Sequence, residues 1–385
     1  GQDKGLRYGE NPDQPAALYE LKKGQLELGG VCFRSAGLGL VSALSEEHIL
    51  QSGKHPGKIN LTDVDNGLNI LQYLSAKPAA IILKHNNPCG AAWSEQSPLT
   101  ALQKAYSADR IAAFGGTVVL NFTINQEVAE FINNSYFEVV AAPDYEYAAL
   151  KILKNRSNLR ILKLPGISRL QEMATEPFLD VKSLVDSGLI LQFSFRNRVL
   201  NKENWLRAEA EHENKLYLAR VPNQQEADDL IFAWAVEAGV TSNSVIFVQN
   251  GATVAIGTGE QDRVGCVELA IHKAYTKYAD LLCYNETSLS LYQLKEKAVT
   301  DPEYDSILKN IQDKTARDHG GLPGSVLVSD GFFPFRDGVD LLIEQGITAI
   351  AQPGGSLRDF EVIQACNQAE PQVAMVFTGQ RSFKH

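Results

Sequence analysis

A lysine and a histidine stand side by side directly after a run of apolar residues. Residues 79–83 are all apolar, and they are followed by Lys84, by His85 and, after two asparagines, by a Pro-Cys-Gly sequence at 88–90. An imidazole can act as a general base near neutral pH, and an ammonium group can stabilise a developing negative charge. We therefore expect a buried strand that ends at an active site, with Pro-Cys-Gly forming a turn.

Two other interpretations of this segment remain open. Zinc nucleoside deaminases carry H-x-E followed by P-C-x-x-C. Here asparagines occupy positions 86 and 87, and Ala92 stands where the second cysteine would be. A catalytic zinc site needs three protein ligands, and this segment supplies two at most. The remaining alternative is a histidine at a strand end that has satisfied hydrogen bonds and no chemistry.

The composition limits the classes of partner. The chain has 385 residues, more than one hydrophobic core usually serves, so we expect two domains. A net charge of −10 argues against a nucleic-acid binder, and no apolar run approaches the ~20 residues that cross a bilayer. The five cysteines lack Cys-x-x-Cys spacing, which is typical of reduced thiols in a cytoplasmic protein.

Short apolar runs alternate with helical patterns along the chain, which predicts an α/β fold. We expect strands at 79–83, 116–120, 138–142, 244–248, 253–256, 325–329 and 347–351. We expect helices at 125–134, 145–154, 264–281, 339–345 and 359–368, with Asn125 as an N-cap. An aromatic turn, a helix, a buried strand and a proline turn follow one another in both halves. This order indicates either a duplicated domain or chance, and a polar break lies at 197–214.

Arginines and a glycine-rich turn could bind an anion. Arg7 and Tyr8 can present a planar guanidinium and a hydroxyl to a phosphate, although such a pair is usually only a surface pair. The Gly-x-Gly sequence at 257–259 precedes an expected helix and resembles an anion-binding turn. Asp262 replaces the third glycine of the dinucleotide fingerprint, so we reject that function, and an ordinary strand-to-helix turn stays open.

Aromatic residues stand after the expected strand at 325–329, where open α/β sheets bind ligands. Phe332, Phe333 and Phe335 can sandwich a flat heterocycle, and Asp337 can accept hydrogen bonds from an amino-pyrimidine ring. Core packing is the alternative for any one of these rings. The C-terminal residues 381–385 are rich in cations, which fits either a phosphate pocket or a solvated chain end.

In order along the chain, these segments resemble the AICAR transformylase part of the AICAR transformylase/IMP cyclohydrolase family, without its cyclohydrolase domain. The resemblance rests on Leu-Arg-Tyr-Gly-Glu-Asn-Pro at 6–12, Lys-His-x-x-Pro-Cys-Gly at 84–90, Ala-Phe-Gly-Gly at 113–116, Ser-Asn-Ser at 242–244, Gly-x-Gly-x-x-x-Arg at 257–263, Ser-Asp-x-Phe-Phe-Pro-Phe-Arg-Asp at 329–337 and Arg-x-Phe-x-His at 381–385. These motifs keep the family's order and span the whole chain.

The resemblance implies two tandem cytidine-deaminase-like subdomains, at 1–196 and 197–385, with mixed sheets flanked by helices. It implies a homodimer with shared active sites and no zinc, and it leaves a structural monovalent cation open. The implied reaction moves the formyl group of 10-formyltetrahydrofolate to the 5-amino group of AICAR, giving FAICAR in purine biosynthesis. That amine is a weak nucleophile, so attack needs a base and a group that stabilises the oxyanion.

The resemblance also implies a role for each matching residue. Catalysis would fall to Lys84, His85 and Asn243, with the imidazole as the base, the ammonium group at the oxyanion and the amide orienting the amine. AICAR would contact Arg7, Tyr8, Phe114, Gly115, Glu138, Phe332, Arg381 and His385. The folate pocket would contain Arg263, Val264, Pro334, Phe335 and Asp337.

One residue departs from the family pattern. Asp13 stands where the family usually has a histidine after Asn-Pro. A carboxylate cannot donate as an imidazolium does, so a non-catalytic protein that binds AICAR is the runner-up hypothesis. A zinc nucleoside deaminase is the third, and the missing ligands count against it.

Overall fold

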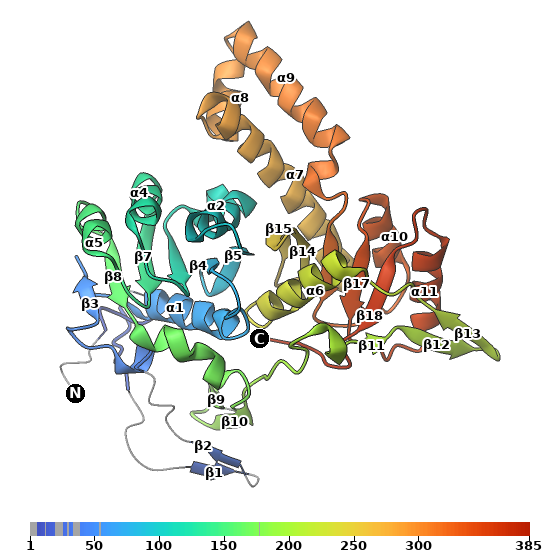
Figure 1. Ribbon diagram of the computed structural model, residues 1–385, viewed down its shortest axis with the longest axis horizontal. Helices are drawn as coiled ribbons and strands as arrows, with labels where there is room; N and C mark the ends of the chain where they lie inside the picture. The colour runs from blue at the N-terminus through green and yellow to red at the C-terminus, as the bar shows by residue number, and fades with distance from the viewer. Residues whose placement is uncertain are drawn as a thin grey trace. The chain divides into compact units, whose positions relative to one another are not determined.

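The computed structural model describes residues 6–11, 13–19, 26–28, 31–33, 39–53, 55–176 and 178–385, and Pro12 of the first motif lies outside them. The chain divides into two compact units (Figure 1). The first contains Gly1–Asn87, Ser94–Ala101 and Gly115–Arg198. The second contains Pro88–Trp93, Leu102–Phe114 and Val199–His385. Two short segments from the first half of the sequence therefore belong to the second unit.

The first unit is built on a mixed sheet. Its strands lie in the order β4 (Ala79–Lys84), β6 (Gly116–Leu120), β7 (Phe137–Ala142), β8 (Arg160–Lys163) and β3 (Ile49–Gln51). The central strands β6, β7 and β8 are parallel, and β4 and β3 are antiparallel to their neighbours. The flanking helices are α1 (Lys58–Leu71), α4 (Gln126–Asn134) and α5 (Tyr147–Leu153). The nearly continuous apolar strands are typical of a sheet covered by helices.

The second unit is likewise built on parallel and antiparallel strands. Its strands lie in the order β11 (Leu206–Arg207), β18 (Ala374–Phe377), β17 (Ala349–Gln352), β16 (Val326–Ser329), β14 (Val245–Gln249), β15 (Ala252–Gly257) and β5 (Asn87–Trp93). Strands β16, β17 and β18 are parallel, and the other pairs are antiparallel. The helices α6 (Gln224–Glu237), α10 (Asp337–Glu344) and α11 (Asp359–Gln368) flank it. Both units thus confirm the α/β fold.

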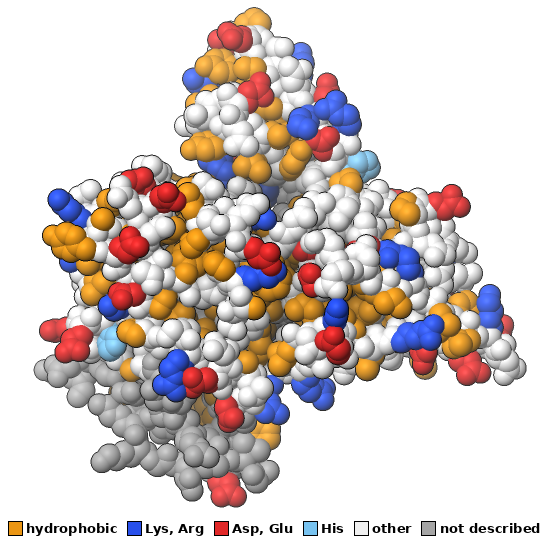
Figure 2. Space-filling model, viewed as in Figure 1, with side chains coloured by type: hydrophobic (Ala, Val, Ile, Leu, Met, Phe, Trp, Pro, Cys, Tyr) orange, Lys and Arg blue, Asp and Glu red, His pale blue; other side chains and the backbone are white. Residues whose placement is uncertain are grey.

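Three helices of the second unit form an arm that projects from its sheet (Figure 1). They are α7 (Arg263–Thr287), α8 (Leu291–Ala298) and α9 (Pro302–Arg317). Helix α7 packs on β15 at its start, and a small core around Cys283, Leu294 and Ile311 joins the three helices. Figure 2 shows Lys, Arg, Asp and Glu side chains interspersed with hydrophobic ones over the arm. The arm therefore has a core of its own beneath a charged surface.

The remaining described elements are short. The strands are β1 (Leu26–Leu28), β2 (Val31–Phe33), β9 (Leu179–Ser183), β10 (Leu189–Phe193), β12 (Glu209–His212) and β13 (Lys215–Leu218). The helices are α2 (Pro98–Ala108) and α3 (Arg110–Ala113). The 3-10 segments are Val41–Ala43, Pro165–Met173, Lys202–Asn204 and His319–Gly321. Strands β9 and β10 form an isolated antiparallel hairpin in the first unit.

The expected Pro-Cys-Gly turn is wrong. Residues 88–90 lie inside β5, and the turn is formed by His85 and Asn86, whose φ angles of 55° and 61° are left-handed. Both central residues of a type I′ turn have positive φ. Gly90 is needed for packing, because a Cβ there would lie 1.9 Å from the carbonyl oxygen of Ala105. Glycine at this position therefore allows a close approach between the strand and a helix.

Candidate functional site

Lys84 and His85 lie where β4 ends, and helix α1 braces the turn that follows. The Asn86 amide N–H donates to Asp63 Oδ1 at 2.6 Å, and Asn66 Nδ2 donates to the Asn86 carbonyl oxygen at 2.9 Å. Because Asp63 and Asn66 are three residues apart on α1, they share one face of the helix. Lys84 is half-buried and His85 is exposed. The two predicted catalytic side chains thus stand at the surface of a rigidly held turn.

Asp63 is a buried carboxylate beside the turn. Only 4% of the residue is exposed, and Thr117 Oγ1 donates to its Oδ2 at 3.3 Å. Burial raises the pKa of Asp63, while the Asn86 N–H, the Thr117 hydroxyl and the charge of His85 act in the opposite direction. The groups around Asp63 thus partly offset the cost of burying its carboxylate.

Gly115 and Glu138 lie together in the same unit. Gly115 has a φ of 75°, and its N–H donates to the Tyr136 carbonyl oxygen at 2.7 Å. A Cβ at Gly115 would lie 3.9 Å from Glu138 Oε1. Arg160 Nη1 lies 3.7 Å from Glu138 Oε2, and Arg160 Nε is buried without a partner among the described residues. This places an accessible glycine backbone beside a carboxylate, as a ribose or an amine would require.

Arg7 and Tyr8 pack at the start of α1. The Arg7 N–H donates to the Pro56 carbonyl oxygen at 3.4 Å, and the Lys58 N–H donates to the Tyr8 carbonyl oxygen at 3.1 Å. The Arg7 guanidinium carbon lies 5.1 Å from the centre of the Tyr8 ring. Arg7 and Asp13 are both exposed. The motif is therefore tied to the helix that also carries Asp63.

In the second unit, Asn243 is held by a buried ion pair. Arg263 Nη2 donates to Asn243 Oδ1 at 3.0 Å, and Arg263 Nη1 donates to Asp330 Oδ1 at 2.5 Å and to the Ser244 carbonyl oxygen at 2.9 Å. The Arg263 and Asp330 side chains are 8% and 0% exposed. Since the Asn243 oxygen accepts from Arg263, its amide NH2 group is left as the donor. Arg263, predicted for the folate pocket, is bonded to these groups here.

A second buried acid stands behind Asn243. Ser244 Oγ donates to Glu237 Oε1, and Ser242 Oγ donates to Asp330 Oδ2. Burial, and then the carboxylate of Asp330, raise the pKa of Glu237 well above its ordinary value. Glu237 Oε2 is buried without a hydrogen-bond partner in the described part of the chain. A buried acid with a raised pKa, Glu237, and a carboxylate paired with Arg263, Asp330, therefore lie next to Asn243.

The C-terminal residues dock beside Asn243. The Ser242 N–H donates to the Lys384 carbonyl oxygen at 2.9 Å, and the Ser382 N–H donates to the Asp330 carbonyl oxygen at 3.1 Å. The Arg381 guanidinium carbon lies 5.4 Å from the centre of the Phe332 ring. The rings of Phe383 and His385 are 6.3 Å apart. Three residues predicted to bind AICAR, Phe332, Arg381 and His385, thus lie on segments joined to the Asn243 loop.

The residues predicted for folate lie at the starts of two helices. Val264 is half-buried in the first turn of α7, and Asp337 is exposed at the first position of α10. Pro334 is half-buried, and Phe335 is 49% exposed beneath the Arg358 guanidinium, 4.8 Å from its ring centre. Phe333 is fully buried in the core, so its expected stacking on a ligand is wrong.

Helix α7 also fixes the segment that leads into Phe114. Arg110 Nη1 donates to Asp280 Oδ2 at 2.9 Å, and Lys277 Nζ lies 3.1 Å from Asp109 Oδ1. Asp280 is 3% exposed as a side chain, and its other oxygen accepts from the Leu291 N–H. Phe114, directly after α3, is 62% exposed. Two ion pairs therefore hold the helical turn that precedes an accessible aromatic ring.

Sequence reasoning missed the residues that position the site. Asp63, Asn66, Glu237 and Asp330 are all buried polar residues on or beside the catalytic segments. Asp63 and Asn66 could have been found as a polar pair at i and i+3 within an apolar helical pattern. Asp330 belongs to a motif that was singled out for its aromatic residues and for Asp337.

The described residues contain no group of three or more His, Cys, Asp or Glu side chains placed to hold a metal ion. Within the same part of the chain, none of the helices combines the length and the apolar character needed to cross a membrane.

Comparisons with known proteins agree along the chain. The family described as AICARFT/IMPCHase bienzyme matches residues 1–273. The chain is 34% identical over 382 residues to the bifunctional purine biosynthesis protein PurH of Magnetococcus marinus, and 34% identical over 380 residues to that of Aquifex aeolicus. The PurH of Persephonella marina is 35% identical over 381 residues. Each match covers 99% of this chain and 59% of the relative, so the chain spans about three-fifths of the length of these curated relatives.

Proposed function

Because the chain belongs to the AICARFT/IMPCHase bienzyme family, we propose that it is the formyltransferase that converts AICAR to FAICAR. The formyl donor is 10-formyltetrahydrofolate, and the reaction is a step of de novo purine biosynthesis. The observation that carries this proposal is the braced turn that presents Lys84 and His85. Helix α1 fixes the turn through Asp63 and Asn66.

In this reaction the 5-amino nitrogen of AICAR attacks the formyl carbon. His85 takes the proton that the amine loses, and Lys84 donates to the oxyanion of the tetrahedral intermediate. The bond from the formyl carbon to N10 of the folate then breaks, and N10 receives a proton as tetrahydrofolate leaves. Asn243 donates through its amide NH2 group to the carboxamide of AICAR, because Arg263 holds its oxygen.

We assign substrate contacts by motif and geometry. AICAR is held by Arg7, Tyr8, Phe114, Gly115, Glu138, Phe332, Arg381 and His385. The folate is held by residues of two segments, which are Arg263, Val264, Pro334, Phe335 and Asp337. Arginine suits the phosphate because its fork donates two hydrogen bonds. Two cytidine-deaminase-like subdomains and a cytoplasmic location are also part of the proposal, and the family resemblance leaves a structural monovalent cation open.

We further propose a homodimer, supported by the β9–β10 hairpin of the first unit. Its register pairs Leu191 with Val181 and Phe193 with Leu179, so these side chains share one face. Val181, Leu191 and Phe193 are 49%, 44% and 49% exposed. Isolated two-stranded hairpins are marginally stable in water, and exposed apolar clusters mark interaction sites. A second copy of the chain would cover this face.

Formation of FAICAR from AICAR and 10-formyltetrahydrofolate tests the activity, followed by the absorbance of tetrahydrofolate. The proposal predicts turnover that requires both substrates and that persists after dialysis against a zinc chelator. AICAR binding without turnover would instead identify a non-catalytic binding protein, and Asp13→His would then be the variant to assay. Deamination of nucleosides that depends on bound zinc would contradict the proposal.

A further inference from the structure

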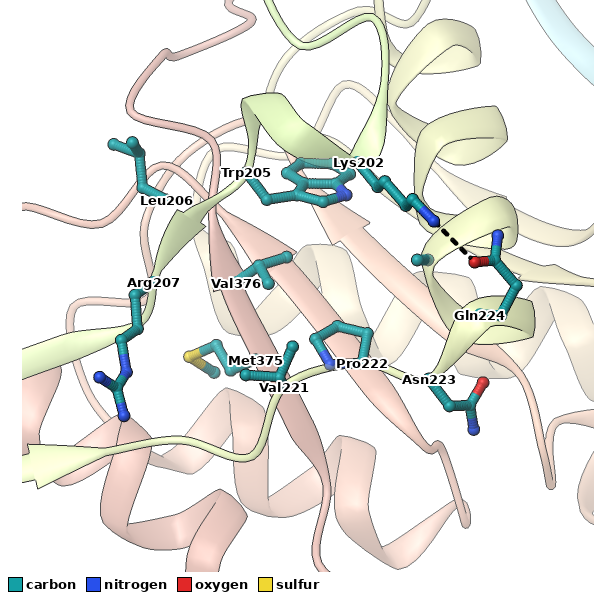
Figure 3. Close-up of a pocket in the computed structure, with 11 residues that line it drawn as sticks. Lys202, Trp205, Leu206, Arg207, Val221, Pro222, Asn223, Gln224, Met375 and Val376 are labelled. Carbon is teal, nitrogen blue, oxygen red and sulfur yellow. Dashed lines mark hydrogen bonds between the residues drawn. The ribbon is translucent and has the colours of Figure 1, made fainter.

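A cavity of about 540 Å³ lies on the second unit, beside the edge strand β11. Its wall is apolar and consists of Trp205, Leu206, Val221, Pro222, Met375 and Val376. Figure 3 shows these side chains between Arg207 at one end and Lys202 with Gln224 at the other. The volume falls within the range of small-molecule sites, roughly 300–1,000 Å³.

The cavity is separate from the Asn243 site. Helix α6 begins at the cavity, where Asn223 is its N-cap, and ends at Glu237, which accepts from Ser244 beside Asn243. The helix has 14 residues, and at 1.5 Å per residue it extends about 20 Å. None of the residues assigned above to AICAR or folate lines the cavity.

The charged side chains that line the cavity are cationic. Its lining contains Lys202 and Arg207 and no acidic residue, in a protein of net charge −10. Lys202 Nζ donates at 2.9 Å to the neutral Gln224 Oε1. Arg207 is exposed and forms no ion pair with another described residue. The field at the cavity therefore favours an anion, and the fork of Arg207 suits a planar carboxylate.

The apolar wall is only partly covered. Leu206 is 55% exposed and Val221 is 65% exposed. The indole of Trp205 offers a flat surface above Val376 in Figure 3. An aromatic ring that enters between Trp205 and Val376 removes apolar area from water, which favours binding.

We propose that this cavity binds a small organic anion with a flat apolar body, of the class of aromatic carboxylates. The ring lies against Trp205, Val221 and Met375, and the carboxylate pairs with Arg207. The site stands apart from formyl transfer, so it would persist in a protein with a disabled catalytic turn.

Fluorine NMR tests the proposal with 2-naphthoate as the probe. The chain has three tryptophans, so protein labelled with 5-fluorotryptophan gives a small set of resonances, and Trp205→Phe identifies the one from the cavity. Trp93 packs against Phe232 and Trp234 is buried, which makes Trp205 the reporter. The proposal predicts a saturable shift of the Trp205 resonance by naphthoate.

Two comparisons show whether the cavity recognises the negative charge of the carboxylate. Arg207→Gln and the neutral probe 2-naphthamide should each bind at least about tenfold more weakly, because a charge-assisted hydrogen bond is lost. Arg317→Gln removes an exposed arginine of α9 and should bind naphthoate as the wild type does. A Trp205 resonance that is unmoved up to about 5 mM naphthoate would overturn the proposal. Equal binding of the acid and the amide, or wild-type binding by Arg207→Gln, would overturn it as well.

Discussion

In each unit, a single buried polar residue positions a predicted functional group. Asp63 accepts the amide N–H of the turn next to His85, and Arg263 holds the oxygen of Asn243. Neither of these groups needs to touch a substrate. Each fixes the direction in which a neighbouring functional group points, and this is the requirement for catalysis by positioned acids, bases and donors.

Asp63→Ala removes the buried acceptor of the Asn86 N–H and should cost about 1–3 kcal/mol of stability, with a loss of turnover as the turn loosens. Asp63→Asn keeps an acceptor for the Asn86 N–H and should stay within about 1 kcal/mol of the wild type. Urea unfolding and initial rates measure both effects. An Asp63→Ala protein with wild-type stability would show that this hydrogen bond does not hold the turn.

Glu237→Gln tests the neutral buried acid. Below about pH 4.3, glutamate in the unfolded chain is protonated like Glu237. The stability that Glu237→Gln gains over the wild type should therefore be smallest there. As the pH rises, the unfolded carboxyl ionises while Glu237 stays neutral because its pKa is raised. Wild-type stability then falls by about 1.4 kcal/mol per pH unit relative to the variant, until Glu237 itself ionises. Melting temperatures over a pH series measure this, and exposed Glu296→Gln should show no such trend.

Helices and strands bring these residues to the site, and the sequence predicts the strands best. Every expected strand is present within two residues, because the apolar runs 79–83 and 116–120 are buried on both faces. The N-cap at Asn125 is confirmed by its hydrogen bond from the Val128 N–H. Helix α7 was expected to end at 281 but continues to Thr287, because its last turns pack on α8 and α9 rather than on the sheet.

The sequence did not predict α1 or the contacts that hold the site. Asp63 and Asn66 interrupt the apolar pattern of α1, so the helix has no clean periodic face. The pairing of Arg110 with Asp280 joins residues that are 170 positions apart, and no local pattern encodes such a contact. Motif order predicts which residues act, whereas their buried partners could be identified only from the structure.

The ion pair between α3 and α7 should carry stability that an exposed pair does not. Asp280→Asn leaves Arg110 buried without its counter-charge and should cost about 3 kcal/mol. It should also lower turnover, because α3 leads into Phe114. Asp305→Asn breaks the exposed pair with Lys309 and should cost less than about 1 kcal/mol. Equal losses in the two variants, measured by denaturant unfolding, would show that burial adds nothing to the α3–α7 contact.

At the scale of the whole molecule, the exposed β9–β10 hairpin is the feature that supports the proposed homodimer. Leu191 and Val181 lie opposite each other on one face, and Asp180 and Gln192 lie on the other. The face of Leu191 and Val181 is thus the more apolar one, since the other carries Asp180, Lys182 and Gln192 beside Ile190, as in a sheet that packs on a partner. This pattern supports the proposed homodimer. Loss of the dimer should also lower activity if the two subunits share their active sites.

Leu191→Lys should weaken the dimer, because it places a charge in the apolar face. Gln192→Lys adds the same charge to the opposite face and should leave assembly unchanged. Sedimentation velocity over a range of protein concentrations compares them. We expect at least about a tenfold rise in the dissociation constant for Leu191→Lys alone. Identical assembly of both variants would place the interface elsewhere.

The most direct measurement is the turnover of AICAR and 10-formyltetrahydrofolate by the wild type and by His85→Asn, with AICAR affinity measured alongside. Asparagine tolerates the left-handed backbone of position 85, so the substitution removes the imidazole and spares the turn. We predict a loss of about 10²–10⁴ in kcat with AICAR affinity nearly unchanged. A His85→Asn protein that turns over like the wild type would contradict the assignment of His85 as the base.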